Sequence, residues 1–212
     1  MVSQNEVLTK FRALFVLKDD SIIRHIGSTW IWQETRVTDR LLLDHLARRI
    51  CIGLCPLRKG EVKWTAFDFD AHGDHSKEDL QPDVLATLTA LQAHGIDGHI
   101  EDSGRGYHIW VFFEQPLPAD PVRRLLARLM AGNHEIYCNG HSIRLPLGAY
   151  PENKKFFCCF LDKEFKPFPD QREYLVRRIR PTEMRILERA LSSASEDEPE
   201  PSKKRDSVTK ER

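Results

Sequence analysis

The segment VKWTAFDFD at residues 62–70 constrains this chain most, because it reads as a buried strand that ends in two acidic residues. Side chains alternate between the two faces of a strand, so Asp68 and Asp70 point to one face while Phe67 and Phe69 point into the core. The two carboxylates lie about 7 Å apart by strand geometry and repel each other unless a cation sits between them. Mg²⁺ and Mn²⁺, which prefer oxygen ligands, are the natural occupants. The alternative is a strand end with two solvated acids, which the preceding run VKWTAF disfavours.

Segments with strand and helix patterns alternate along the chain, which predicts an α/β or α+β fold. From about Ser192 onward, charges of both signs dominate and no aromatic residue occurs, so we expect a disordered charged tail over 192–212. The expected elements are a short helix and a hairpin within 11–36, a helix capped by Thr38, strands at 51–57 and 62–70, a helix with Pro82 near its start and Gly95 at its end, strands near 98–102 and 107–113, a helix opened by Pro118 and Pro121, and short strands at EIYC, SIRLP and FFCCFLD.

Composition narrows the class of protein. Of the 212 residues, 41% are hydrophobic and 30% charged, as in a globular protein, and no run of about 18 apolar residues suggests a membrane span. We expect no secretory signal, and the odd number of cysteines, with Cys158 and Cys159 adjacent, is typical of reduced thiols in a cytoplasmic protein. Net charge is zero, but residues 144–180 carry nine Lys and Arg against five Asp and Glu, which indicates either a phosphate-facing patch or an ordinary solvated surface.

The turn SGRGYH follows the paired aspartates by one helix and one strand. Gly104 and Gly106 let the backbone turn tightly and bring N–H groups close to an anion. Ser103 and Arg105 add hydroxyl and guanidinium donors suited to phosphate, and His108 lies where it could donate to a phosphate oxygen. A glycine-rich hairpin turn is a weak signal alone, but its spacing from the aspartates strengthens it.

Two further residues have both a functional and a structural interpretation. Arg144, inside the apolar segment IRLPLG, must find an anion or be exposed at the strand end, and a structural salt bridge is the alternative. Glu135, in the segment HEIYC just upstream, could be a third acidic ligand or an ordinary surface glutamate.

A metal-dependent hydrolase or nuclease is an alternative reading. The run DAHGDH at residues 70–75 is similar to the HxHxDH zinc motif of metallo-β-lactamase-like hydrolases, with His72, Asp74 and His75 as the candidate residues. The first histidine of that motif is an aspartate here, and no later histidine has a convincing setting. The cysteines lack paired CxxC knuckles, so buried thiols are favoured over zinc ligands.

Taken in order, these motifs resemble the archaeo-eukaryotic primase superfamily. The order is a strand ending in DFD, a helix, a strand, SGRGYH opening another strand, an acidic residue in HEIYC, and then IRLPLG. The resemblance is in particular to the primase-polymerase domains of TOTE conflict systems and to CRISPR-associated primase-polymerases. The segments FRALFVLKDDS, VTDRLLLDHLARRICIGLCPL and PFPDQREYL also fit, so it covers roughly residues 8–180.

The resemblance implies a DNA primase or primase-polymerase, a nucleotidyltransferase that uses two ions, Mg²⁺ or Mn²⁺. Its partners would be a single-stranded DNA template, nucleoside triphosphates and a primer, with a helicase or other replication or defence proteins left open. A catalytically silent module that binds a nucleotide or single-stranded DNA is an alternative. By the same resemblance, the metal-binding and catalytic residues are Asp68, Asp70 and Glu135, and the nucleotide-binding residues are Ser103, Arg105, Gly106, His108, Arg144, Lys154 and Lys155.

The resemblance also implies a mixed sheet with a core like that of the RNA-recognition motif (RRM), flanked by helices. The N-terminal α/β module would cover residues 1–60 and the catalytic core 61–185. The template would follow the basic segment, with Trp110 or Phe168 as a stacking platform, although core packing is the alternative for Trp110. Many relatives have a histidine where Tyr150 stands, and the large helicase and nuclease regions of full conflict-system proteins are absent from this sequence, so we expect a minimal unit.

Overall fold

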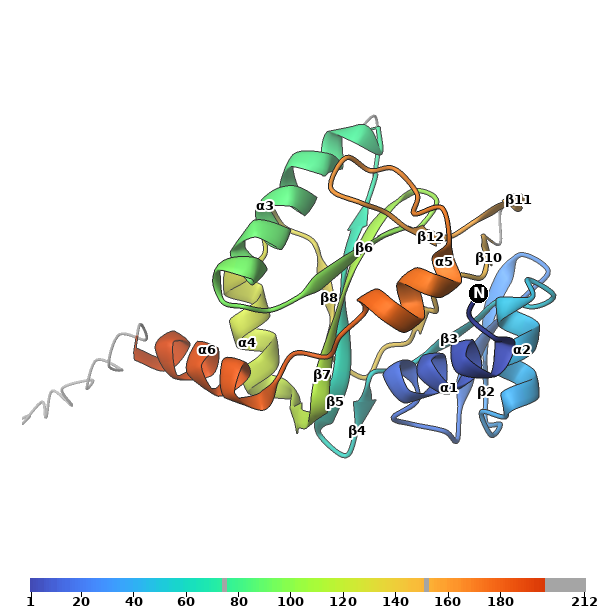
Figure 1. Ribbon diagram of the computed structural model, residues 1–212, viewed down its shortest axis with the longest axis horizontal. Coiled ribbons are helices and arrows are strands. Elements are labelled where there is room, and N and C mark those ends of the chain that lie inside the picture. Colours follow the sequence, from blue (N-terminus) through green and yellow to red (C-terminus); the bar gives the residue numbers. More distant parts are fainter. Residues whose placement is uncertain (74–75, 151–152, 197–212) are drawn as a thin grey trace, which may run out of the picture.

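The computed structural model describes residues 1–73, 76–150 and 153–196, and Figure 1 shows a central sheet with helices on both sides. The main sheet has the strand order β12–β6–β7–β5–β4, and β8 also pairs with β5. Its strands are β4 (Leu57–Arg58), β5 (Glu61–Asp70), β6 (Gly98–Asp102), β7 (Gly106–Pro118), β8 (Glu135–Tyr137) and β12 (Cys159–Phe160).

The core of this sheet is the RRM-like arrangement that we expected. Helix α3 (Gln81–Ala93) connects β5 to β6, and α4 (Ala119–Leu129) connects β7 to β8, so the chain order is βαββαβ. A mixed sheet was expected, but the described ladders of this sheet are antiparallel. The reason is that the strands joined by a helix are not neighbours in the sheet. Strand β7 lies between β5 and β6 and is antiparallel to both, and β5 lies between β7 and β8 in the same way.

A second sheet has the order β2–β1–β3–β9. Its strands are β1 (Ile22–Ile26), β2 (Thr29–Gln33), β3 (Ile52–Leu54) and β9 (Ile143–Arg144), with helices α1 (Gln4–Phe15) and α2 (Asp39–Leu46) in the same part of the chain. Thr38 caps α2 as predicted, because its side chain accepts from the Leu41 amide. Since β9 joins the N-terminal strands, this sheet brings Arg144 beside them. The division of the chain near residue 60 stays a prediction.

Two hydrophobic clusters cover the two faces of the main sheet. On one face, Phe67 and Phe69 pack with α3, α4 and α6 (Met184–Glu196), all of which lie on the same side of the sheet in Figure 1. On the other face, Trp64 and Trp110 pack with Phe15 of α1. The predicted orientation of the DFD segment is therefore confirmed: its phenylalanines are buried under the helices, and its aspartates point to the opposite face.

Several elements near the C-terminus were not predicted. They are β10 (Ala149–Tyr150), α5 (Gln171–Glu173), the π-helical turn η2 (Tyr174–Arg178) and α6. Strand β11 (Asn153–Phe157) overlaps the start of the predicted strand FFCCFLD, and the 3₁₀ turn η1 (Glu78–Leu80) directly precedes α3. Helix α6 buries Leu187 and Ala190 and continues to Glu196, so the tail boundary at Ser192 is placed too early. The rest of that tail lies outside the described residues. None of the described helices has the length and apolar character needed to cross a membrane.

His45 of α2 is fully buried and links the N-terminal module to the segment after β9. Its Nε2 lies 3.0 Å from the Pro146 carbonyl oxygen, and its Nδ1 lies 3.4 Å from the Ile52 amide nitrogen. These partners fit the neutral ring with its proton on Nε2, because Nε2–H then donates to the carbonyl and Nδ1 accepts from the amide. Burial lowers the pKa of His45 from 6.5 to about 4.

We expect acidification to destabilise the protein through His45. Because the folded-state pKa lies below that of the unfolded chain, this contribution to stability is complete above pH 6.5 and is lost as the pH falls toward 4. At about 1.4 kcal/mol per pH unit, the loss at pH 5 is about 2 kcal/mol. Urea unfolding at pH 7 and pH 5 should show a smaller loss for His45→Gln than for wild type.

The exposed His141 supplies the control for this experiment, since His141→Gln should lose as much stability as wild type on acidification. The buried His99, whose pKa burial also lowers to about 4, contributes equally in all three proteins. If His45→Gln and wild type lost the same free energy of unfolding between the two pH values, the neutral buried state of His45 would be contradicted.

Candidate active site

The register of β5 against β7 builds the centre of the site. Asp68 lies opposite His108 and Asp70 lies opposite Gly106, so the aspartates and the SGRGYH turn meet at one end of the sheet. A Cβ at Gly106 would clash with the carbonyl oxygen of Phe69, so only glycine permits this close approach of the two backbones. The turn therefore closes directly over the end of β5, and its glycine has a structural role.

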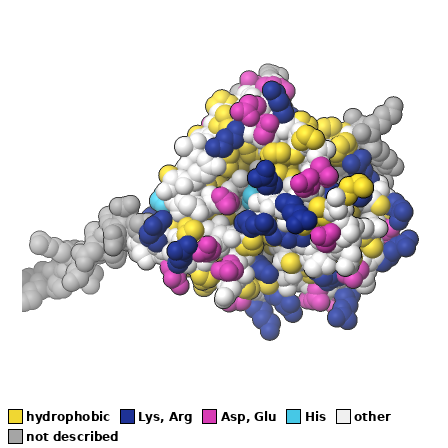
Figure 2. All heavy atoms as spheres, viewed as in Figure 1, with side chains coloured by type: hydrophobic (Ala, Val, Ile, Leu, Met, Phe, Trp, Pro, Cys, Tyr) yellow, Lys and Arg dark blue, Asp and Glu magenta, His cyan; other side chains and the backbone are white. Residues whose placement is uncertain are grey.

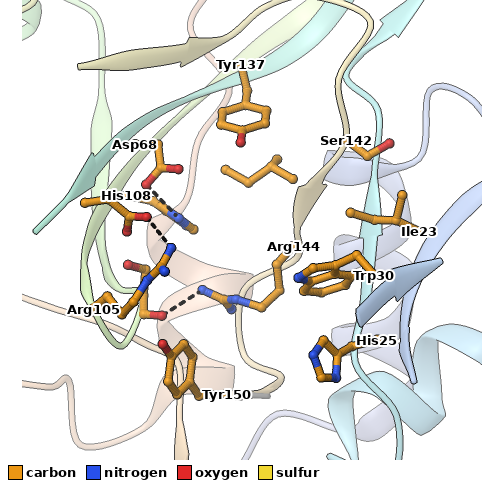
Figure 3. A pocket seen from close by; sticks show the side chains of 13 residues that line it. Ile23, His25, Trp30, Asp68, Arg105, His108, Tyr137, Ser142, Arg144 and Tyr150 are labelled. Atoms are coloured by element: carbon orange, nitrogen blue, oxygen red, sulfur yellow. Dashed lines mark hydrogen bonds and ion pairs between the residues drawn. The ribbon is translucent and has the colours of Figure 1, made fainter. Parts of the chain in front are cut away.

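A cavity of about 320 Å³ opens at this point, within the size range of small-ligand sites. Six of the predicted site residues line it: Asp68, Asp70, Ser103, Arg105, His108 and Arg144. Figure 3 shows the two sides of the cavity, with Asp68 and His108 on one side and Trp30 and His25 of the β1–β2 hairpin on the other. In that view Arg144 projects between them. The main sheet and the N-terminal sheet thus build the cavity together.

His108 is held between two carboxylates. Its Nδ1 lies 2.8 Å from Oε2 of Glu101 on β6, and its Nε2 lies 3.4 Å from Oδ1 of Asp68. Burial alone would lower the pKa of His108, but the Asp68 and Glu101 carboxylates outweigh it and raise the pKa from 6.5 to about 9. The imidazole is therefore cationic at neutral pH and places a positive charge next to Asp68.

Glu101 organises the residues beneath the cavity, and sequence reasoning missed it. It has no exposed surface, and besides His108 it accepts hydrogen bonds from Trp110 Nε1 at 2.7 Å and from an Arg144 guanidinium nitrogen at 3.2 Å. Burial would raise the pKa of Glu101, but Arg144 and His108 outweigh it and keep the pKa below its usual value. A buried carboxylate requires such partners. The only sequence signal was an acidic residue at an inward position of the strand GHIED.

Arg144 combines the two roles that its sequence context allowed. It is buried, pairs with Glu101, and also donates to the carbonyl oxygens of Leu145 at 3.1 Å and Ser103 at 3.3 Å. The salt-bridge interpretation is thus confirmed, while the same side chain lines the cavity. The exposed Arg105 pairs with Asp70 at 2.5 Å, so this aspartate also has a cationic neighbour.

The two aspartates fit a divalent cation. Asp68 Oδ1 is buried, and the described residue that faces it is His108, whose Nε2 lies 3.4 Å away. The pKa of Asp68 is kept low, since His108, Arg144 and Arg105 outweigh the effect of burial, and an ionised carboxylate with a free lone pair is a suitable ligand. Mg²⁺ is commonly held by one or two carboxylates together with water and substrate phosphates.

The role of Glu135 as a third acidic ligand stays a prediction. Glu135 on β8 lies opposite Asp68 in the β5–β8 register, but its side chain is 49% exposed and lies 3.8 Å from His141. Within residues 1–73, 76–150 and 153–196, no group of three His, Cys, Asp or Glu side chains is arranged to hold a metal ion. The three-carboxylate site implied by the resemblance therefore stays a prediction, with Glu135 opposite Asp68 on the neighbouring strand.

Other predicted residues lie elsewhere. Trp110 is fully buried, so core packing, the alternative for this residue, is confirmed. Phe168 stacks on Tyr174 at 4.0 Å, and neither Trp110 nor Phe168 lines the cavity. Lys154 and Lys155 fall on β11, but their side chains lie outside the described part of the structure. The cysteines are free thiols, four of them buried, as expected for reduced residues. The cavity residues that sequence reasoning did not assign to the site are Ile23, His25, Trp30, Tyr137, Ser142 and Ile143.

Comparison with known proteins shows which family this chain belongs to. Among solved structures, the polymerase domain of ligase D from Mycobacterium tuberculosis in complex with DNA is similar, with a TM-score of 0.46, 11% sequence identity, and coverage of 91% of this chain and 87% of that chain. No curated protein matches the sequence. Residues 25–139 match the family described as the archaeo-eukaryotic primase domain of TOTE conflict systems. That match covers more than half of the 212 residues, and the chain belongs to this primase family.

Proposed function

We propose that this protein is a template-dependent nucleotidyltransferase, a DNA primase or primase-polymerase that joins nucleotides on single-stranded DNA with two divalent cations. The observation that carries the proposal is the meeting of Asp68, Asp70, His108 and Arg144 at one cavity in a chain of the primase family. Carboxylates that can hold Mg²⁺ or Mn²⁺, beside buried cations that can bind phosphate, are what phosphoryl transfer requires.

The proposed reaction extends a nucleic acid by one nucleotide. A 3′-hydroxyl oxygen attacks the α-phosphorus of a nucleoside triphosphate, the bond to the bridging oxygen of the β-phosphate breaks, pyrophosphate leaves, and the hydroxyl proton passes to solvent. Bound cations supply a lowered pKa for that hydroxyl and stabilise the leaving pyrophosphate. Asp68 and Asp70 would hold the cations, while His108, Arg105 and Arg144 would offset the negative charge of the triphosphate. Ser103 and the Gly106 backbone belong to the same turn.

The cationic character of the phosphate-binding side is built into the fold. His108 is charged because Asp68 and Glu101 raise its pKa, and Arg144 is fixed by Glu101 and two carbonyl oxygens. Groups that are already positioned need no reorganisation when charge develops in the transition state. Glu101 is thus a positioning residue for the two cationic side chains, His108 and Arg144.

The template would follow positively charged surface. Figure 2 shows Lys and Arg side chains gathered over the α5–η2 segment, where Arg172, Arg177, Arg178 and Arg180 are exposed. These arginines belong to the basic segment recognised in the sequence, and contacts with phosphates at such a surface weaken as salt rises.

The direct test is incorporation of labelled nucleotides on a single-stranded DNA template, with Mg²⁺, with Mn²⁺ and with EDTA, and with or without a primer. We expect products that require both template and metal, and products without a primer would identify a primase. Ribonucleotides and deoxyribonucleotides are tested separately. Absence of product with every metal, primer and nucleotide would contradict the proposal and favour the silent binding module.

The hydrolase alternative is tested in the same preparation. Of its candidate residues, His72 is exposed, whereas Asp74 and His75 lie outside the described residues. We expect His75→Ala to incorporate nucleotides at the wild-type rate, because this residue has no part in the proposed site. Loss of all activity in His75→Ala, together with cleavage of nucleic acid by wild type, would favour the hydrolase.

A further inference from the structure

We propose that one face of the β1–β2 hairpin, formed by His25, Trp30 and Trp32, binds unpaired bases of the single-stranded template by stacking. This inference rests on the proposed function and names residues beside the cavity that contact the template. We call these three residues the tryptophan face.

The tryptophan face leaves two large aromatic side chains exposed on an edge strand. Trp30 is 41% exposed and Trp32 is 60% exposed, while Trp64 and Trp110 have no exposed surface. Strand β2 is also the edge strand of its sheet, with one neighbour, β1. Natural proteins normally protect an edge strand with charges or proline, because exposed apolar edges promote aggregation. An unprotected sequence TWIWQ at an edge therefore indicates a binding role.

The register of the hairpin places the aromatic rings on one side. His25 lies opposite Trp30 and Ile23 lies opposite Trp32, so these side chains share a face of the sheet. The His25 and Trp30 rings meet edge to face, with centroids 5.2 Å apart and an interplanar angle of 78°. That contact positions the Trp30 indole, which is still 41% exposed.

The same face continues into the candidate active site. Ile23, His25 and Trp30 line the cavity together with Asp68 and Arg144. In Figure 3 the Trp30 ring stands across the cavity from Asp68 and His108. Trp32, two residues further along the strand, lies about 7 Å from Trp30 on the same face. Its cross-strand partner Ile23 also lines the cavity.

This arrangement suits a nucleic-acid strand better than a polypeptide strand. A polypeptide added to the β2 edge would take its affinity from backbone hydrogen bonds and would use both faces of the hairpin equally. Here one face leads to buried cations and carboxylates, and the ring spacing offers surfaces for successive bases. Stacking on aromatic side chains tolerates any base sequence, as a template contact must.

The experiment measures binding separately from catalysis, with EDTA present. The full chain is titrated with oligo(dT), with the same oligonucleotide in which the bases are replaced by abasic sites, and with salt varied. Acrylamide quenching of tryptophan fluorescence reports on Trp30 and Trp32, because the other two tryptophans are buried. We expect oligo(dT) to protect the tryptophans from acrylamide and the abasic strand to bind more weakly.

Single variants locate the contact. Trp30→Ala and Trp32→Ala should each weaken oligo(dT) binding by roughly 5- to 150-fold, the range for loss of one stacking ring, and should leave abasic-strand binding unchanged. Ile31→Ala is the matched control, since Ile31 is 42% exposed on the same strand but points to the opposite face. Unchanged oligo(dT) affinity in both tryptophan variants, or equal loss in the Ile31→Ala control, would overturn the inference.

The other occupants of this face give different results. If concentration-dependent dimerisation of the wild-type chain disappears in Trp32→Ala while oligo(dT) binding is retained, the face is a protein interface and the inference is wrong. If oligo(dT) binding depends on the tryptophans but no nucleotide is ever incorporated, the inference stands and the proposed polymerase activity fails. If incorporation occurs and the tryptophan variants bind and extend as wild type does, the inference alone fails.

Discussion

Asp68→Asn and Asp70→Asn are each expected to reduce nucleotide incorporation by roughly 10²- to 10³-fold or more. Each replacement removes a negative charge that would hold a divalent cation and keeps the size of the side chain. The contact that Asp68→Asn weakens besides the cation site is the ion pair between Asp68 Oδ1 and His108 Nε2, which lie 3.4 Å apart. Incorporation on a primed single-stranded template, measured over a series of Mg²⁺ and Mn²⁺ concentrations, gives the rates.

The controls separate lost chemistry from lost structure. Asp120→Asn, at a position 80% exposed on α4, should keep the wild-type rate. Both active-site variants should bind oligo(dT) in EDTA as tightly as wild type, because the template contact does not require the carboxylates. Wild-type rates in Asp68→Asn would show that the catalytic cation is held elsewhere, and joint loss of binding and incorporation would indicate a collapsed site.

Local patterns were sufficient to predict how the DFD strand presents its residues. Strand periodicity placed the two aspartates on one face, and the structure buries Phe67 and Phe69 on the other. Gly104 and Gly106 were predicted to allow a tight turn with N–H groups near an anion, and the structure adds a close approach of Gly106 to the Phe69 carbonyl. The faces of the DFD strand are set by neighbours along that one strand, whereas the contact of Gly106 with Phe69 joins β7 to β5.

Features that depend on distant pairing were missed. Glu101 meets Arg144 from 43 residues away, and nothing in the strand GHIED shows which cation it will face. The aromatic residues show the same limit, since Trp110 is buried because β7 is a central strand, whereas Trp30 is exposed because β2 lies at an edge. Strand order sets both outcomes, and a single sequence does not reveal it without a family resemblance.

Glu101→Ala should destabilise the protein by about 3–5 kcal/mol, the usual result of removing one partner of a buried ion pair. The guanidinium of Arg144 and the ring of His108 would both remain buried without their carboxylate. For a domain of this size the melting temperature should fall by roughly 6–20 °C. Urea unfolding and thermal melting measure the loss, and the half-exposed Glu135→Ala should stay within about 0.5 kcal/mol of wild type.

A double-mutant cycle keeps this prediction testable if Glu101→Ala does not fold. Glu101→Gln retains an acceptor for Trp110 but removes the charge, and Arg144→Met removes the other charge. The losses of stability in the two single variants should sum to more than the loss in the double variant, because the double variant leaves no unpaired charge at these two positions. Additive losses would mean that Glu101 and Arg144 are not coupled. A coupled pair would show that the buried carboxylate of Glu101 stabilises the fold through Arg144, the arginine proposed to bind phosphate.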